Sequence, residues 1–110
     1  QGLPDKRRLV LVLDTSAQIA LLKGDIAKAI AEAEQSLKTS QGIADLKDFY
    51  EAHYTLYAAY SSDQKFAKAA EHLQKFIELA GSQLSPSEKK DLEEELKRVK
   101  RQKDANRQKG

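Results

Sequence analysis

The feature that most restricts how this chain folds is an internal repeat with a period of forty residues. Residues 24–30 (GDIAKAI) align with residues 64–70 (QKFAKAA), so that Ala29 coincides with Ala69. Self-similarity at such a spacing is typical of a supersecondary unit that stacks on a copy of itself. The sequence therefore predicts two helix pairs of about forty residues each, followed by a single helix.

Composition and turn residues favour helix in every part of the chain. Ala and Leu supply 29 residues and Val and Ile only 8, a bias that favours helix over strand. The only prolines are Pro4 and Pro86, so no proline interrupts a helix between them. Glycine and polar turns instead divide the chain into five expected helices, at about 5–23, 25–38, 43–61, 64–80 and 86–108. The expected fold class is all-α.

Both copies of the repeat carry one turn-and-helix signature. A turn is followed at once by an aliphatic or aromatic residue, Ile26 or Phe66, and three residues later by Ala29 or Ala69. Residues 9–80 thereby resemble the tetratricopeptide repeat family, in a variant with long helices. This resemblance implies antiparallel hairpins stacked as a short right-handed α-solenoid with a C-terminal capping helix.

The domain organisation follows from that resemblance. The chain, 1–110, is expected to be a single tetratricopeptide-like domain and a fragment of a longer chain. Repeat one spans about 5–40, repeat two about 43–80 and the capping helix about 85–108. The second copy departs from the family pattern, since Gln64 and Lys65 replace the Gly-Asp turn and Tyr57 replaces a small residue. The period of forty also exceeds the usual 34.

The resemblance also implies a function, because the first helices of such hairpins line a groove that binds a peptide or a partner helix. The matching positions lack the Lys, Arg and Asn clamp of receptors for C-terminal carboxylates. The expected groove is aromatic and weakly acidic and suits an apolar or basic peptide of a partner protein. Its candidate partner-binding residues are Asp14, Gln18, Tyr50, Tyr54 and Tyr57. The alternative for the tyrosines is that they are packing residues.

Two other functions stay open. One is a self-associating sensor or assembly module of a larger bacterial signalling protein, which predicts a homo-oligomer. The other is a metal-dependent nuclease, because the run 9–13 followed by Asp14 is similar to the first strand of PIN domains. That strand presents an aspartate to a divalent cation, but the site needs more carboxylates from other strands. No later segment of this sequence has the pattern of a strand.

Catalytic, cofactor and metal chemistry find no support in the sequence. Cysteine is absent, which excludes disulfides and thiolate chemistry. His53 and His72 have no histidine four residues away, and the chain has no glycine-rich phosphate loop and no nucleophile elbow. We therefore expect no enzyme, no cofactor and no metal site.

Charge and hydropathy limit the partners and leave the compartment open. No stretch is long and apolar enough for a membrane span. Residues 97–110 contain seven basic residues and one acidic residue, but acidic residues precede them and no aromatic residue lies among them. This arrangement suits a solvated helix end better than a nucleic-acid surface. The localisation is either cytoplasmic or periplasmic.

Overall fold

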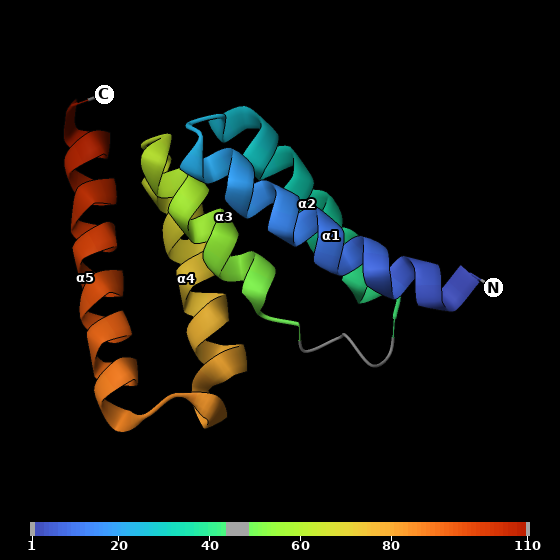
Figure 1. Ribbon diagram of the computed structural model, residues 1–110. Helices are drawn as coiled ribbons and strands as arrows, with labels where there is room; N and C mark the ends of the chain where they lie inside the picture. Colours follow the sequence, from blue (N-terminus) through green and yellow to red (C-terminus); the bar gives the residue numbers. More distant parts are fainter. Residues whose placement is uncertain (1, 44–48, 110) are drawn as a thin grey trace.

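The computed structural model describes residues 2–43 and 49–109, and this part of the chain forms five α helices and no β strand (Figure 1). The expectation of an all-α fold is confirmed. The helices are α1 (Gly2–Leu22), α2 (Ile26–Gln41), α3 (Glu51–Ser62), α4 (Phe66–Ala80) and α5 (Pro86–Lys109), with a 3₁₀ turn η2 (Gly81–Gln83) before α5.

The helices pack as antiparallel neighbours in a row (Figure 1). Short turns join α1 to α2 and α3 to α4, which makes each pair a hairpin. Helix α2 also contacts α3, α1 contacts α3, and α5 lies against α4. The row therefore begins with α1 and α2 and ends with α5.

The two hairpin turns have the same backbone structure. In each turn four equivalent N–H groups donate to equivalent carbonyls, and the two sets lie forty residues apart. The donors are Lys23, Gly24, Asp25 and Ala29 in the first turn and Asp63, Gln64, Lys65 and Ala69 in the second. Both turns place their middle residue in the left-handed region, with φ of 83° at Gly24 and 59° at Gln64. The sequence alignment at offset forty thus corresponds to a repeated local structure.

The core follows the small residues of the repeat. Ala29 and Ala69 are fully buried, because each lies where two helices come close. Larger side chains fill the space between α3, α4 and α5, where Leu56, Leu73 and Val99 are also fully buried. The centre of the core therefore lies in the second hairpin and α5.

Helix α3 begins later than the sequence predicts. The expected helix started at residue 43, whereas α3 starts at Glu51; residues 44–48 lie outside the described part of the chain. Ile43 and Phe49 are non-helical and are buried against Val10. Burial of these side chains under α1, rather than continuation of a helix, determines the path of the chain here.

The strand that a metal-dependent nuclease requires at residues 9–13 is absent. These residues belong to α1, and Val10 is fully buried against α2 and the α2–α3 connection. The run is instead part of a long helix, in which Val10 is buried while Leu9, Leu11 and Val12 are exposed.

Helix α5 begins with a capping box and stays beside α4 beyond its midpoint. The Ser85 N–H donates to Glu88 Oε1 at 2.9 Å, and the Glu88 N–H donates to Ser85 Oγ at 3.1 Å. Further along, the amide of Asn106 donates to the backbone oxygen of Gln64 at 3.3 Å. The second half of α5, which the sequence analysis expected to be a solvated helix end, thus also contacts the rest of the molecule. None of the helices among the described residues is long and apolar enough to cross a bilayer.

Candidate binding groove

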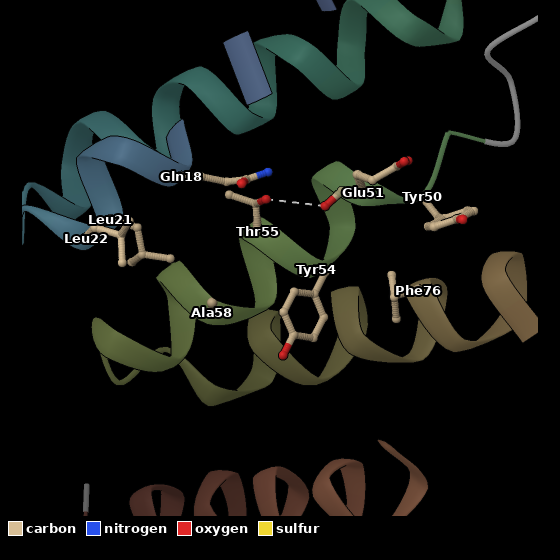
Figure 2. A pocket seen from close by; sticks show the side chains of 9 residues that line it. All are labelled: Gln18, Leu21, Leu22, Tyr50, Glu51, Tyr54, Thr55, Ala58 and Phe76. Atoms are coloured by element: carbon tan, nitrogen blue, oxygen red, sulfur yellow. Dashed lines mark hydrogen bonds between the residues drawn. The ribbon is translucent and has the colours of Figure 1, made fainter. Parts of the chain in front are cut away.

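An open groove of about 450 Å³ lies between the C-terminal half of α1 and the exposed side of α3 (Figure 2). Most of its surface is apolar, and one side chain of α4 closes its end. The lining residues are Gln18, Leu21, Leu22, Tyr50, Glu51, Tyr54, Thr55, Ala58 and Phe76. A hollow with an apolar wall and a few polar groups is the usual form of a binding site for an apolar ligand or side chain.

Aromatic rings form one wall of the groove. The ring centroid of Phe76 lies 5.5 Å from that of Tyr50, edge to face, and 5.1 Å from that of Tyr54. Tyr54 is nearly half exposed, and Figure 2 shows its ring between α3 and α4. Rings at these distances hold one another in place, so the wall is preformed.

Asp14 accepts hydrogen bonds from two polar side chains that line the groove. Thr55 Oγ1 donates to Asp14 Oδ1 at 2.9 Å, and Gln18 Nε2 donates to Asp14 Oδ2 at 2.9 Å. Asp14 itself is only 5% exposed and does not line the groove. Burial raises the pKa of its carboxyl above the ordinary value, although both hydrogen bonds act in the opposite direction. Asp14 therefore ties α1 to α3 and positions two lining residues.

Tyr57 also lies outside the groove. Its hydroxyl donates to the carboxylate of Glu95 on α5, and Glu95 in turn accepts from Arg98. Burial raises the pKa of the Tyr57 hydroxyl, and the neighbouring Glu95 adds to that effect. The contact joins α3 to α5. Of the five candidate residues, the structure thus brings Gln18, Tyr50 and Tyr54 together at the groove and places Asp14 and Tyr57 in contacts between helices.

Six lining residues are absent from the sequence-based candidates: Leu21, Leu22, Glu51, Thr55, Ala58 and Phe76. Leu22 is the last residue of α1 and is 88% exposed. In the sequence, a large apolar residue beside a turn is only a weak indication of such an exposed site. Phe76 belongs by spacing to the core stripe of α4, and the packing of α3 leaves it at the edge of that stripe. Glu51 is the only carboxylate that lines the groove.

The two histidines meet away from the groove. The Nδ1 atoms of His53 and His72 lie 3.0 Å apart, and the ring of Tyr60 stacks on His72 at 5.7 Å between centroids. Burial lowers the pKa of His53 to about 4 and also lowers that of His72. Spacing along one helix gave no sign of this pair, because the partners come from α3 and α4. The described residues contain no cluster of three or more His, Cys, Asp or Glu side chains that could hold a metal ion.

Comparison of the chain with protein-family models, with curated proteins and with solved structures finds no match.

Proposed function

We propose that this chain is a tetratricopeptide-like scaffold, a short right-handed α-solenoid, that binds an apolar segment of a partner protein in the groove between α1 and α3. Two features support the solenoid: the turn structure recurs after forty residues, and the helices of both hairpins touch at fully buried alanines, Ala29 and Ala69. The groove lies on the first helices of the two hairpins, which are the helices that contact ligands in such arrays.

The observation that carries the proposal is the exposed apolar surface around the hollow. Single exposed apolar residues are ordinary on protein surfaces, but here they gather around one hollow from more than one helix. Leu22 and Tyr54 are the largest exposed apolar side chains among the lining residues, and Ala58 leaves space between them. Such a surface fits an amphipathic helix or an extended segment that inserts one or two large apolar side chains.

Charge favours a partner segment with basic residues beside its apolar anchors. Glu51 is the only charged side chain in the lining, and it is exposed. Residues 1–96, the part of the chain that contains the groove, have sixteen acidic and twelve basic residues and thus an excess of negative charge. Lys or Arg residues that flank the anchors would be attracted to this face, and acidic flanks would be repelled.

The direct test is selection of peptides from a displayed random library on the immobilised chain. We expect enriched peptides with large apolar anchors and Lys or Arg flanks. The affinity of a selected peptide is then measured by fluorescence anisotropy for the wild type and the Ala58→Arg variant. An arginine at this position fills the hollow and repels basic flanks, so the affinity is expected to fall roughly tenfold or more.

The control is Ala31→Arg, the same substitution at an exposed position of α2 that does not line the groove. It is expected to leave the affinity unchanged. A second pair separates charge from shape: Glu51→Lys should weaken binding of basic-flanked peptides, and Glu93→Lys on exposed α5 should not. Failure to enrich any peptide, or equal binding by Ala58→Arg and the wild type, would contradict the proposal.

A second candidate function is self-association within a larger assembly. The observation that favours it is a separate apolar surface, on the outward side of α1, where large apolar residues are exposed although they lie outside the groove.

A further inference from the structure

The outward face of α1 is apolar although no helix in the described part of the chain covers it. Leu11 is 56% exposed, Val12 55% and Ile19 48%. On the opposite side of the same helix Val10 and Ala17 are fully buried. A helix that is apolar on both faces is typical of one that packs on both sides.

The other outward faces show that this is not a general property of the chain. Five of the six large apolar residues that are exposed among the described residues belong to α1. The exposed face of α2 instead carries Lys28, Gln35 and Lys38. At the other end of the row, α5 presents a charged surface to solvent. One end of the molecule is therefore polar and the other is apolar.

The spacing of the apolar face indicates what kind of element covers it. Five residues lie along one line of α1 and are separated alternately by four and three residues, and Leu11 lies beside this line. We call the set the α1 stripe; it consists of Arg8, Leu11, Val12, Thr15, Ile19 and Leu22. A repeat of this kind, 3.5 residues on average, keeps a seam facing a second helix that lies nearly along the first. The α1 stripe thus suits another helix of similar length.

We propose that the α1 stripe is the contact of a symmetrical, antiparallel dimer of this chain. The stripe is nearly the same when read from either end, because apolar residues lie on both sides of Thr15. A two-fold axis between Thr15 and Ser16 places Val12 against Ile19 of the second copy. The small Thr15 and Ser16 side chains lie at the axis and allow the two helices to approach closely.

Charge selects the antiparallel orientation. In a parallel pair Arg8 would face Arg8 of the second copy, and the two guanidinium groups would repel each other. In the antiparallel pair the Arg8 stem packs on Leu22 of the second copy, and its guanidinium lies near the C-terminal carbonyls of that copy's α1. Lys23 and Asp25 follow Leu22 at the same end, and their opposite charges offset each other, so the attraction for Arg8 comes from the helix carbonyls.

The area is sufficient for a reversible dimer. Burial of the exposed stripe residues of both copies would remove on the order of 1,000 Å² from water, which is the lower end of specific protein interfaces. We therefore expect a dissociation constant in the micromolar range. The groove does not depend on this contact, since Leu22 is the one residue that both surfaces share.

Sedimentation equilibrium from micromolar to millimolar concentration tests the proposal. The wild-type mass is expected to rise from 12.3 kDa toward twice that value. Ile19→Glu should weaken dimerisation about tenfold or more by placing two carboxylates in the contact, and Ala31→Glu on α2 should not change it. Circular dichroism of Ile19→Glu should show the helix content of the wild type, so that a loss of the dimer is not a loss of the fold. A wild type that stays monomeric, or an Ile19→Glu variant that dimerises as the wild type does, overturns the proposal.

Cross-linking tests the orientation without relying on a disruptive substitution, because the chain has no cysteine. Facing helices about 10 Å apart bring Cα atoms at the axis to about 5 Å, within reach of a disulfide. Thr15→Cys should therefore form a disulfide-linked dimer under mild oxidation, whereas Arg8→Cys alone should not. A mixture of the Arg8→Cys and Leu22→Cys variants should cross-link to each other. Equal cross-linking by Thr15→Cys and by Ala31→Cys, or preferential cross-linking by Arg8→Cys alone, would contradict this dimer.

Discussion

At the scale of single residues, polar groups that look isolated in the sequence are buried in pairs contributed by different helices. Asp14 accepts from Thr55 across the α1–α3 contact, and His53 meets His72 across the α3–α4 contact. A buried polar group that loses its partner costs more than the hydrogen bond itself contributes, because it stays removed from water. These pairs therefore restrict how the helices rotate against one another.

The His53–His72 pair predicts lower stability at mildly acidic pH. Burial and the nearby second imidazole lower the pKa of His53 from 6.5 to about 4, and burial lowers that of His72. Below pH 6.5 the unfolded chain thus binds more protons than the folded chain, so the free energy of unfolding falls as the pH falls toward 4. One histidine contributes at most about 1.4 kcal/mol per pH unit. Two carboxylates facing the pair, Glu34 and Glu71, reduce the effect, and two lysines, Lys68 and Lys75, increase it.

Urea unfolding at pH 7.5 and at pH 5.5 measures this dependence. The His53→Gln variant provides the comparison, since it retains every carboxylate that also titrates at acidic pH. Its free energy of unfolding should decrease less between the two values than that of the wild type. An identical decrease in both proteins would show that the histidine pair does not cause it.

At the scale of elements, the two hairpin turns reach the same backbone structure with different residues. Gly24 has φ of 83° and Gln64 has φ of 59°, so a residue with a side chain occupies the left-handed region in the second turn. Glycine adopts this conformation without strain, whereas other L residues do so at a cost. The hydrogen bonds of the turn and the packing of α3 on α4 compensate for that cost.

This difference predicts opposite effects of two substitutions. Gln64→Gly should raise the free energy of unfolding by up to about 1 kcal/mol, and Gly24→Ala should lower it by about 1 kcal/mol. No atom lies within 4 Å of a methyl group built at Gly24, so the cost there is conformational. Gly81→Ala is the control: its site is equally open, but its φ of −52° suits alanine. Urea unfolding measures all three, and a loss at Gly81 equal to that at Gly24 would contradict the explanation.

At the scale of the whole molecule, the two ends of the row of helices differ. Helix α5 covers the second hairpin through Leu96 and Val99, and its outward side is charged. The hydroxyl of Tyr57 adds a polar contact to Glu95 of the same helix. In the proposed solenoid, two repeats are fewer than the three that such arrays usually need to be stable alone. Burial under α5 at one end and the proposed dimer contact of α1 at the other would supply additional buried surface.

A matched pair of Tyr→Phe variants tests whether Tyr57 stabilises the packing of α5, with the groove residue Tyr54 as the control. Tyr57→Phe removes the hydrogen bond to Glu95 and should lower the free energy of unfolding by about 1 kcal/mol. Tyr54→Phe is the same change at an exposed position and should alter it by less than about 0.5 kcal/mol. Urea unfolding compares the two variants. Equal effects would show that the Glu95 contact does not stabilise the docking of α5.

The groove residues show what the periodicity of the sequence does not predict. The sequence put Tyr54 and Tyr57 together in the expected groove, whereas Tyr54 contacts Phe76 at the groove and Tyr57 contacts Glu95 on α5. They are three residues apart, so a small rotation of α3 decides which of them α5 contacts and which stays in the groove. In the same way Asp14 has the spacing of a groove residue but points toward Thr55. Periodicity identifies a face, but it does not give the direction of each side chain within that face.

The sequence by itself determined the helical segments, their turns and the forty-residue repeat, because these depend on hydrogen bonds and conformational preferences within a few neighbouring residues. It did not determine the later start of α3, which follows from the burial of Ile43 and Phe49 under α1. Nor did it determine which polar groups pair or which apolar faces stay exposed. Only the tertiary structure decided these, since they depend on atoms from different helices reaching the same place.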